Sequence, residues 1–310
     1  MNNIKKNIIL ISYFQKYNIK HKYHILLMLS NWTLISKDNL YRFRPELAKL
    51  EVAEYFHSSI YQMYSKMYFK YIHGELVICK TATIMGNYSF IRYCYTDNSE
   101  TVKKALLDNG FTLRGSDIEK GTKDKFGDEC IYSTDECVEL HGKPFARFRN
   151  ILRRYNMFED TTIQNGYDTD IDVVVHKWSF EHKSKHQLKL LEFIKYNLEL
   201  VQITRIYYKN TIVGFSVVER LNDTNGVIIQ RLINPDIKSL IIEPNILIHY
   251  ADCYSNPGMF LNIGASRNKK IKVAKDKLRP FSYLKIRRNI APVKLSRSDW
   301  QHFKEHLLID

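Results

Sequence analysis

Cysteine, glycine and long apolar runs are all scarce in this 310-residue sequence, and each scarcity excludes a class of protein. Five cysteines are too few and too scattered for a disulfide-stapled fold, and their spacing matches no zinc site, so no metal site is expected. No apolar run approaches the roughly 18 residues needed to cross a bilayer. No small-residue cleavage site follows the short apolar runs near the N-terminus, which argues against a secretory signal. These features predict a cytoplasmic protein with reduced thiols.

The net charge of the chain is +14, and its positive charge is concentrated in three segments that contain almost no acidic residues. Residues 1–37 carry six lysines and no acid, and residues 143–154 carry five lysines or arginines and no acid. Residues 267–288 carry ten lysines or arginines and one acid, Asp276. Clustered cations favour a polyanionic partner, because each neutralised phosphate releases a counterion. The charge pattern predicts binding to tRNA, DNA, an anionic membrane surface or a phosphate-bearing cofactor. The alternative is that these cations bind no partner and only face solvent, in a sequence that is rich in lysine throughout.

The first part of the chain predicts helices around a pair of strands. Loosely helical apolar spacing favours a basic helical extension over residues 1–36. Aromatic and β-branched residues predict strands over 76–83 and 88–95, joined by a turn at 85–87. An N-cap serine and an early glutamate predict a helix over 99–109. Helices over 45–55 and 59–67 are also expected.

The second part of the chain predicts helices that flank a three-strand meander. In chain order, the expected elements are a helix over 142–156, helices over 178–180 and 185–200, strands over 204–208, 212–219 and 227–233, a helix over 243–254, a strand over 259–263, a helix over 269–275 and a last strand over 281–288. This order resembles that of an acyltransferase domain of the GNAT type.

Two motifs sharpen the resemblance. The first runs from Leu140-His141-Gly142-Lys143 into a helix that contains Arg149-Asn150. The second joins Leu261-Asn262-Ile263-Gly264 to Lys275-Asp276-Lys277-Leu278-Arg279-Pro280. Together they resemble the C-terminal domain of phosphatidylglycerol lysyltransferases. That family includes enzymes that move an aminoacyl group from tRNA to a lipid hydroxyl, and a broader group moves amino acids from tRNA to amines.

The resemblance implies an α+β fold of two tandem GNAT-like (acyl-CoA N-acyltransferase-like) domains, each with a mixed central sheet flanked by helices. It covers roughly residues 130–292 well and residues 39–125 only in outline. After the helical extension at 1–36, the implied N-terminal domain spans 37–128. The C-terminal domain at 129–310 would then carry the site.

The resemblance also implies roles for particular residues. Lys275 would stabilise the tetrahedral oxyanion or the phosphate of the donor, and Asn262 and Gly264, at the end of a central strand, would line the acceptor cleft. Phosphate groups would be bound by basic or amide side chains of the motifs and of the meander: Lys143, Arg147, Arg149, Asn150, Arg231, Lys277 and Arg279.

Glycine is missing from residues 234–242, where acetyl-transferring GNAT enzymes bind the coenzyme A pyrophosphate through a glycine-rich loop. Aminoacyl-tRNA is therefore favoured over acyl-CoA as the donor, and no resident cofactor is expected. The sequence predicts an acyltransferase that moves an aminoacyl group from tRNA to a hydroxyl or an amine; a lipid acceptor would require peripheral contact with a membrane. Two alternatives stay open: an acyltransferase that modifies bases in phage or mobile-element DNA, and a catalytically inactive nucleic-acid-binding module on the same fold.

Overall fold

The computed structural model describes residues 32–83, 90–95, 98–108, 111–119, 121–123, 127–156, 159–241, 243–266 and 268–290. The expected helical extension therefore lies outside the described residues up to residue 31, and the expected turn at 85–87 lies outside them entirely. No helix of the described residues is both long enough and apolar enough to cross a membrane.

The described chain divides into two compact units, and both are discontinuous in sequence. The first contains residues 32–35, Lys66–Thr122 and residues 287–290. The second contains Ser36–Ser65 and Lys123–Ile286. This grouping differs from the contiguous domains expected at 37–128 and 129–310, because the segment Ser36–Ser65 is bonded to the second unit.

The first unit is built on a mixed sheet with the strand order β1-β2-β3-β4-β5-β14-β6 among the described residues. Its strands are β1 (Thr33–Leu34), β2 (Tyr68–Ile72), β3 (Glu75–Thr83), β4 (Phe90–Tyr95), β5 (Phe111–Gly115), β6 (Thr122–Lys123) and β14 (Arg287–Asn289). Helix α5 (Glu100–Asp108) packs on the sheet by burying Val102 and Leu106 against Phe111 and Leu113. The two strands and the helix expected over 76–109 are confirmed in β3, β4 and α5.

The second unit is built on a larger mixed sheet with the strand order β13-β7-β12-β11-β10-β9-β8 among the described residues. Its strands are β7 (Glu129–Ser133), β8 (Thr161–Asn165), β9 (Gln202–Tyr208), β10 (Thr211–Arg220), β11 (Asn225–Ile233), β12 (Phe260–Ala265) and β13 (Ser282–Leu284). The expected meander is confirmed in β9, β10 and β11, which pair antiparallel. Strands β11 and β12 pair in parallel.

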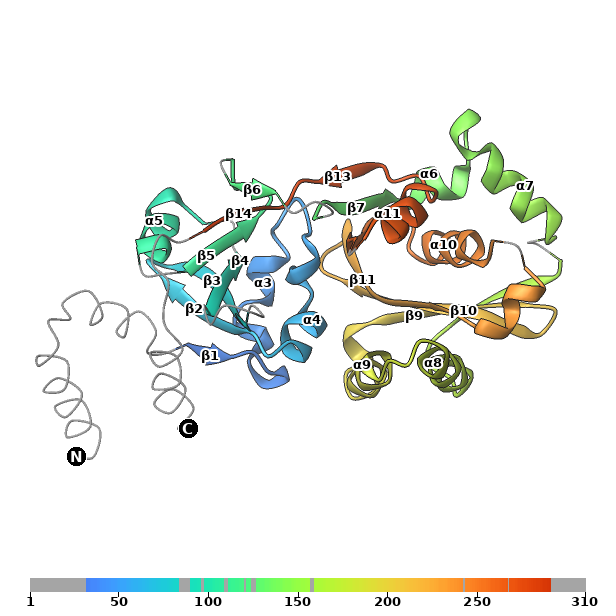
Figure 1. Ribbon diagram of the computed structural model, residues 1–310, viewed down its shortest axis with the longest axis horizontal. Helices are drawn as coiled ribbons and strands as arrows, with labels where there is room; N and C mark the ends of the chain where they lie inside the picture. The colour runs from blue at the N-terminus through green and yellow to red at the C-terminus, as the bar shows by residue number, and fades with distance from the viewer. Residues whose placement is uncertain are drawn as a thin grey trace, which may run out of the picture. The chain divides into compact units, whose positions relative to one another are not determined.

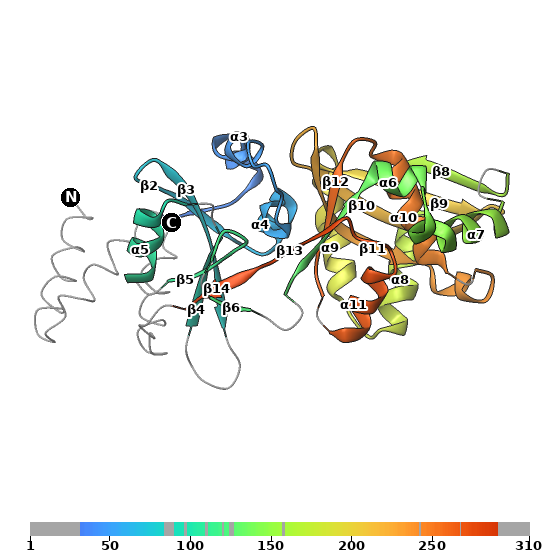
Figure 2. The same ribbon diagram turned by 90° about the horizontal axis from the view of Figure 1, so that it is seen from above.

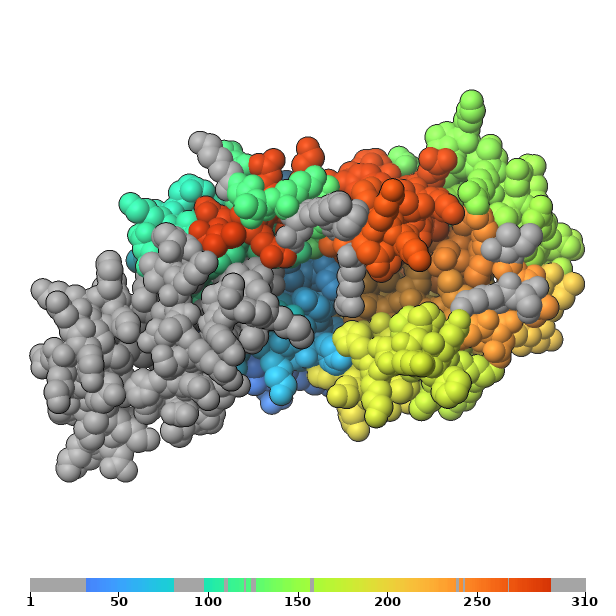
Figure 3. Space-filling view, viewed as in Figure 1, coloured from blue at the N-terminus to red at the C-terminus, as the bar shows by residue number. Residues whose placement is uncertain are grey.

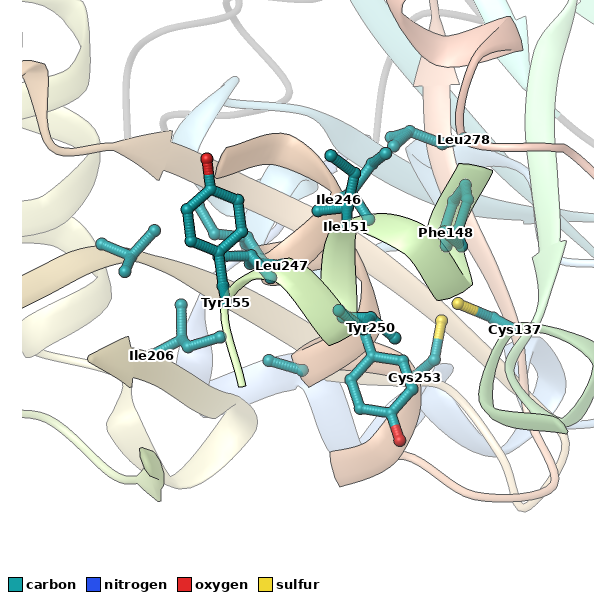
Figure 4. Packing of buried hydrophobic residues seen from close by; sticks show 14 of the residues in the cluster. Cys137, Phe148, Ile151, Tyr155, Ile206, Ile246, Leu247, Tyr250, Cys253 and Leu278 are labelled. Atoms are coloured by element: carbon teal, nitrogen blue, oxygen red, sulfur yellow. The ribbon is translucent and has the colours of Figure 1, made fainter. Parts of the chain in front are cut away.

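Helices cover both faces of this second sheet (Figure 1). On one face lie α8 (Asp170–Glu181) and α9 (His186–Lys195); on the other lie α6 (Thr134–Glu139), α7 (Ala146–Arg154), α10 (Pro244–Ser255) and α11 (Lys269–Asp276). Figure 2 looks onto the face that α6, α7, α10 and α11 cover. Between that layer and the sheet lies a buried apolar cluster that includes Phe148, Leu247 and Leu278 (Figure 4).

A helix and a strand that the sequence predicts have different bounds in the structure. Helix α8 begins at Asp170 rather than near residue 178, because Ile171, Val174 and Val175 bury one face of it and acids in its first turn suit the helix dipole. The expected last strand over 281–288 is two short strands, because β13 pairs with β7 whereas β14 pairs with β5.

The helix expected over 45–55 is confined to α3 (Arg44–Leu47). Two asparagines explain where it ends: Asn222, in the turn between β10 and β11, and Asn225, the first residue of β11. Asn222 Nδ2 donates to the carbonyls of Ala48 and Leu50, and Asn225 Nδ2 donates to the carbonyl of Glu51. These carbonyls are therefore bonded to side chains instead of continuing a helical ladder.

Glu219, at the end of β10, ties the segment Ser36–Ser65 to the second unit. Its carboxylate is fully buried and accepts hydrogen bonds from Ser58 Oγ (2.7 Å) and from the backbone N–H groups of Ser59 and Ile60 (both 3.0 Å). These donors stand at the start of α4 (Ser59–Tyr64). Burial raises the pKa of Glu219, and the hydrogen bonds oppose that shift.

We expect Glu219→Gln to lower the free energy of unfolding by about 2–4 kcal/mol, because an amide nitrogen would then face N–H donors in a buried site. The matched control is Glu139→Gln, an exposed change that should cost no more than about 0.5 kcal/mol. Urea denaturation of both variants measures the difference. Equal urea midpoints for the two variants would show that Glu219 does not anchor the segment.

Candidate functional site

The parallel strands β11 and β12 separate soon after they meet. They pair only at Asn225↔Phe260, Gly226↔Leu261 and Val227↔Asn262, although β11 continues to Ile233 and β12 to Ala265. A register shift in the β10–β11 ladder inserts Ile229 as an extra residue in β11, and such a bulge bends a strand. The two strands therefore leave a split in the sheet.

Lys275, the first predicted catalytic residue, occupies the end of β12. Its Nζ donates to the carbonyls of Ile263 (2.9 Å), Gly264 (2.8 Å) and Ala265 (2.9 Å). Burial lowers its pKa to about 8. In this arrangement all three ammonium protons are used by the backbone, because an ammonium group has three donors. The structure thus places Lys275 as a cation that closes the strand end rather than as a free donor to a substrate.

Asn262, predicted to line the acceptor cleft, is likewise fully bonded. Its Nδ2 donates to the carbonyl of Ala53 and to Glu129 Oε2, both at 2.7 Å, and its Oδ1 accepts from the N–H of Gly264 at 2.6 Å. Glu129 Oε2 also accepts from the N–H of Tyr55 at 2.7 Å. Asn262 therefore holds residues 53–55 against the sheet.

Gly264, the third predicted catalytic residue, allows the Tyr55 ring to approach this strand end. Its φ is +73°, and a Cβ built on it would lie 2.8 Å from Tyr55 Cδ2. The hydroxyl of Tyr55 reaches across to the carbonyl of Ile229, the bulged residue, at 3.2 Å. The glycine is thus required by backbone conformation and by packing at the same position.

Arg231, predicted to bind phosphate, is instead buried beside the split. Its Nη2 donates to Asp252 and, at 3.3 Å, to His249 Nδ1, both on α10. Only 8% of its side chain is exposed, so it does not lie on a surface that a phosphate backbone could reach. Its Nε and Nη1 are buried and have no hydrogen-bond partner within the described residues. Arg231 is therefore a buried guanidinium of which one nitrogen is bonded to α10 and two have no partner among the described residues.

Three residues around Arg231 were not identified from the sequence. Asp252 and His249 are fully buried, and the ring of Tyr132 packs edge-on against His249 with centroids 4.6 Å apart. Burial raises the pKa of Asp252, and the charge of Arg231 opposes that shift. Tyr132 also donates its hydroxyl to the carbonyl of Lys275 at 3.0 Å, which links the two cations of the site. The signal that could have revealed them is a histidine and an aspartate one turn apart in an otherwise apolar helix.

The predicted phosphate-binding residues of the first motif divide into two groups. Arg147 pairs with Glu243, and Arg149 donates to the carbonyls of Leu140 and Gly142, so both guanidinium groups have internal partners. Lys143 and Asn150 are exposed, and so are Lys277 and Arg279 of the second motif. The structure therefore keeps these four side chains at the surface of the second unit.

A pocket of about 390 Å³ opens between α6, α7 and α10. Its lining combines apolar and aromatic side chains (Val138, Leu140, Leu152 and Tyr250) with one amide (Asn156) and three charged side chains (Arg149, Arg153 and Glu159). None of the three predicted catalytic residues, Lys275, Asn262 and Gly264, lines this pocket.

No protein-family model matches the sequence, and a search of curated proteins found no match. Solved structures do share the fold. A conserved protein of unknown function from Bacteroides thetaiotaomicron has a TM-score of 0.68 at 14% identity, covering 84% of this chain and 99% of that chain. L-PGS from Bacillus licheniformis has a TM-score of 0.58 at 15% identity, covering 86% of this chain and 95% of that chain.

The C-terminal domain of a putative lysylphosphatidylglycerol synthetase from Agrobacterium fabrum also shares the fold. Its TM-score is 0.53 at 12% identity, covering 81% of this chain and 90% of that chain. The structural neighbours thus include the family that the two motifs resemble. The predicted fold class, tandem GNAT-like units with mixed sheets flanked by helices, is confirmed.

Gly264→Ala and Gly258→Ala should differ in cost although both glycines have a φ of +73°. A Cβ on Gly258 meets nothing within 4 Å, so that change should cost about 1 kcal/mol for the left-handed backbone alone. Gly264→Ala adds the clash with Tyr55 and should cost about 1–3 kcal/mol more. Urea midpoints of the two variants measure the difference; equal losses would mean that the Tyr55 ring is not held at this strand end.

Proposed function

We propose that this protein is an acyltransferase that holds the reacting acyl carbonyl in the split between β11 and β12 and takes the acyl group from aminoacyl-tRNA. The observation that carries the proposal is Arg231, a buried guanidinium beside the split, two of whose nitrogens have no hydrogen-bond partner in the part of the chain that the structure describes. The fold shared with L-PGS and with the putative lysylphosphatidylglycerol synthetase supports it.

Acyl transfer needs hydrogen-bond donors where negative charge develops on the carbonyl oxygen. Nε and Nη1 of Arg231 meet this need in a site where water is excluded, because a guanidinium stays charged and presents its donors in a fixed plane. Asp252 and His249 hold the third nitrogen of the group and so fix its orientation. Lys275 contributes positive charge nearby and holds the end of β12 in place.

The transfer reaction needs few further chemical groups from the protein. The acceptor nitrogen or oxygen attacks the carbonyl carbon, the ester bond to the ribose breaks, and the proton of the acceptor ends on the ribose oxygen. No covalent intermediate on the protein is required. Holding the ester and the acceptor side by side supplies much of the rate acceleration.

Exposed cations around two helices of the second unit support a polyanionic carrier for the acyl group. No ion pair joins these six to an acid within the described residues: Lys143, Arg153 and Arg154 around α7, and Lys269, Lys270 and Lys277 around α11. Both helices border the same apolar cluster, because Leu278 and Phe148 belong to it. In Figure 3 the orange-red atoms of α11 lie at the surface. This basic surface would hold the phosphates of the tRNA.

The double variant Arg231→Gln/Asp252→Asn tests the site, because it removes both buried charges together and leaves neutral hydrogen-bonding groups. We expect it to slow transfer by about 100-fold or more, the usual cost of a lost oxyanion donor. The assay incubates the protein with a tRNA pool charged with labelled amino acids, and follows protein-dependent loss of the ester and label in a lipid or amine fraction. The control is Arg147→Gln/Glu243→Gln, an ion pair at the surface in which Arg147 is half exposed, and its loss should change the rate less than about twofold. Equal rates for the two double variants would contradict the role of Arg231.

The variant Arg153→Ala/Arg154→Ala/Lys269→Ala/Lys270→Ala tests the basic surface. Its affinity for tRNA should fall, and its log-affinity against log-salt plot should be shallower by up to about three, because fewer counterions are released. The control is Lys49→Ala/Lys103→Ala, two lysines paired with acids. Filter binding at several salt concentrations measures both. An unchanged slope, or a preference for duplex DNA over tRNA, would contradict a tRNA donor bound here.

A further inference from the structure

Cys137, His249 and Cys253 form a buried cluster that the proposed transfer reaction does not use. Cys137 lies on α6, and His249 and Cys253 lie one turn apart on α10. The two sulfurs and the nearest ring nitrogen lie within 4.8 Å of one another, with His249 Nε2 4.0 Å from Cys253 Sγ. Figure 4 shows the sulfurs of Cys137 and Cys253 pointing toward each other.

The protonation of His249 argues against a metal ion in this cluster. Arg231 Nη2 lies 3.3 Å from His249 Nδ1, and a guanidinium can only donate, so Nδ1 must accept. A neutral imidazole that accepts at Nδ1 carries its proton at Nε2, the nitrogen that faces the sulfurs. A metal-bound histidine needs the opposite arrangement, with a free lone pair on the metal side and an N–H donated outward.

The same protonation state favours sulfur chemistry. The Nε2–H of His249 points at the two sulfurs as a donor, and a donor of this kind stabilises a thiolate. A hydrogen bond from Cys253 lowers the pKa of Cys137, burial opposes that shift, and His249 adds to the lowering. Burial raises the pKa of Cys253. The cluster therefore pairs one thiolate-prone sulfur with one sulfur that keeps its proton, as thiol–disulfide chemistry requires.

We propose that Cys137 and Cys253 are a redox modification site at which a peroxide forms a disulfide between α6 and α10. The thiolate of Cys137 attacks one peroxide oxygen, the O–O bond breaks, and the departing hydroxide takes a proton to become water. The sulfur of Cys253 then attacks the sulfenic sulfur of Cys137, the S–O bond breaks, and a second water leaves with the Cys253 proton. Two thiols and one hydrogen peroxide thus give one disulfide and two waters.

A small oxidant would approach from the pocket between α6, α7 and α10, whose lining contains neighbours of the two cysteines but neither sulfur. Its lining includes Val138, the neighbour of Cys137 on α6, and Tyr250, one turn before Cys253 on α10. Both elements that carry the sulfurs therefore border a solvent-accessible space. Among the described side chains, no other histidine and pair of cysteines are grouped in this way.

The disulfide would have two consequences for the second unit. It would close a long loop of chain between residues 137 and 253, which restricts the unfolded chain and raises stability. It would also remove the thiolate that accepts from His249, the residue that helps to orient Arg231. Oxidation should therefore raise the urea midpoint and slow the proposed transfer reaction, and the first effect does not depend on the proposed function.

The test treats the reduced full-length protein with one equivalent of hydrogen peroxide, blocks remaining thiols with N-ethylmaleimide under denaturing conditions, and maps tryptic peptides by mass spectrometry. The expected result is a linked peptide pair containing Cys137 and Cys253, which dithiothreitol separates. Cys130→Ala, a buried cysteine removed elsewhere in the unit, should form the same link. Cys253→Ala should instead leave a sulfenic acid on Cys137, which dimedone traps.

Three results would overturn the proposal. The first is that both thiols still react with N-ethylmaleimide after peroxide treatment, and the second is that the oxidised protein links a different pair of cysteines. The third is one equivalent of zinc, found by elemental analysis in the wild-type protein and lost in Cys253→Ala, which would make the cluster a metal site. The peptide map is made on the wild-type protein. It therefore decides the question even if Cys253→Ala does not fold.

Discussion

The parallel pairing of β11 and β12 ends at Val227 and Asn262, and the polar groups beyond that point must find other hydrogen-bond partners. Three of the missing partners come from Lys275, which donates to three successive carbonyls of β12. Another comes from Tyr55, whose hydroxyl reaches the bulged Ile229. Asn262 and Glu129 then hold the backbone that carries Tyr55. The motif residues of β12 and α11 thus bond the backbone at the place where the two strands separate.

Positive charge in the second unit has two separate uses, which burial distinguishes. Inside, Arg231 and Lys275 lie beside the split, with Asp252 as the buried counter-charge. A buried ion pair of this kind costs desolvation energy, so it is better explained by what it orients than by stability alone. Outside, several lysines and arginines around α7 and α11 are exposed and have no ion pair with a described acid, and a surface of this kind favours anions through long-range charge. In the proposed reaction, the buried cations would face the reactive ester, and the exposed cations would bind the polyanion that carries it.

The sequence allowed prediction of the local elements and of the fold class, because these depend on neighbouring residues. The β-branched residues of the meander and Pro244 at the start of α10 are examples, and the two motifs identified the fold. The roles of Asn262 and Lys275 could not be predicted, because their partners are set by tertiary contacts; Ala53, for instance, is more than two hundred positions from Asn262. Arg231 was expected to bind phosphate, but its partners His249 and Asp252 come from a helix that packs on the strand only in the folded chain.

The central claim is that the split beside Arg231 receives the acyl carbonyl. The most direct measurement is a crystal structure of the protein with an aminoacyl-adenosine analogue in which an amide replaces the reactive ester. The account predicts the carbonyl oxygen of the analogue within hydrogen-bond distance of Nε or Nη1 of Arg231. An analogue bound elsewhere, with ordered water on both nitrogens of Arg231, would contradict it.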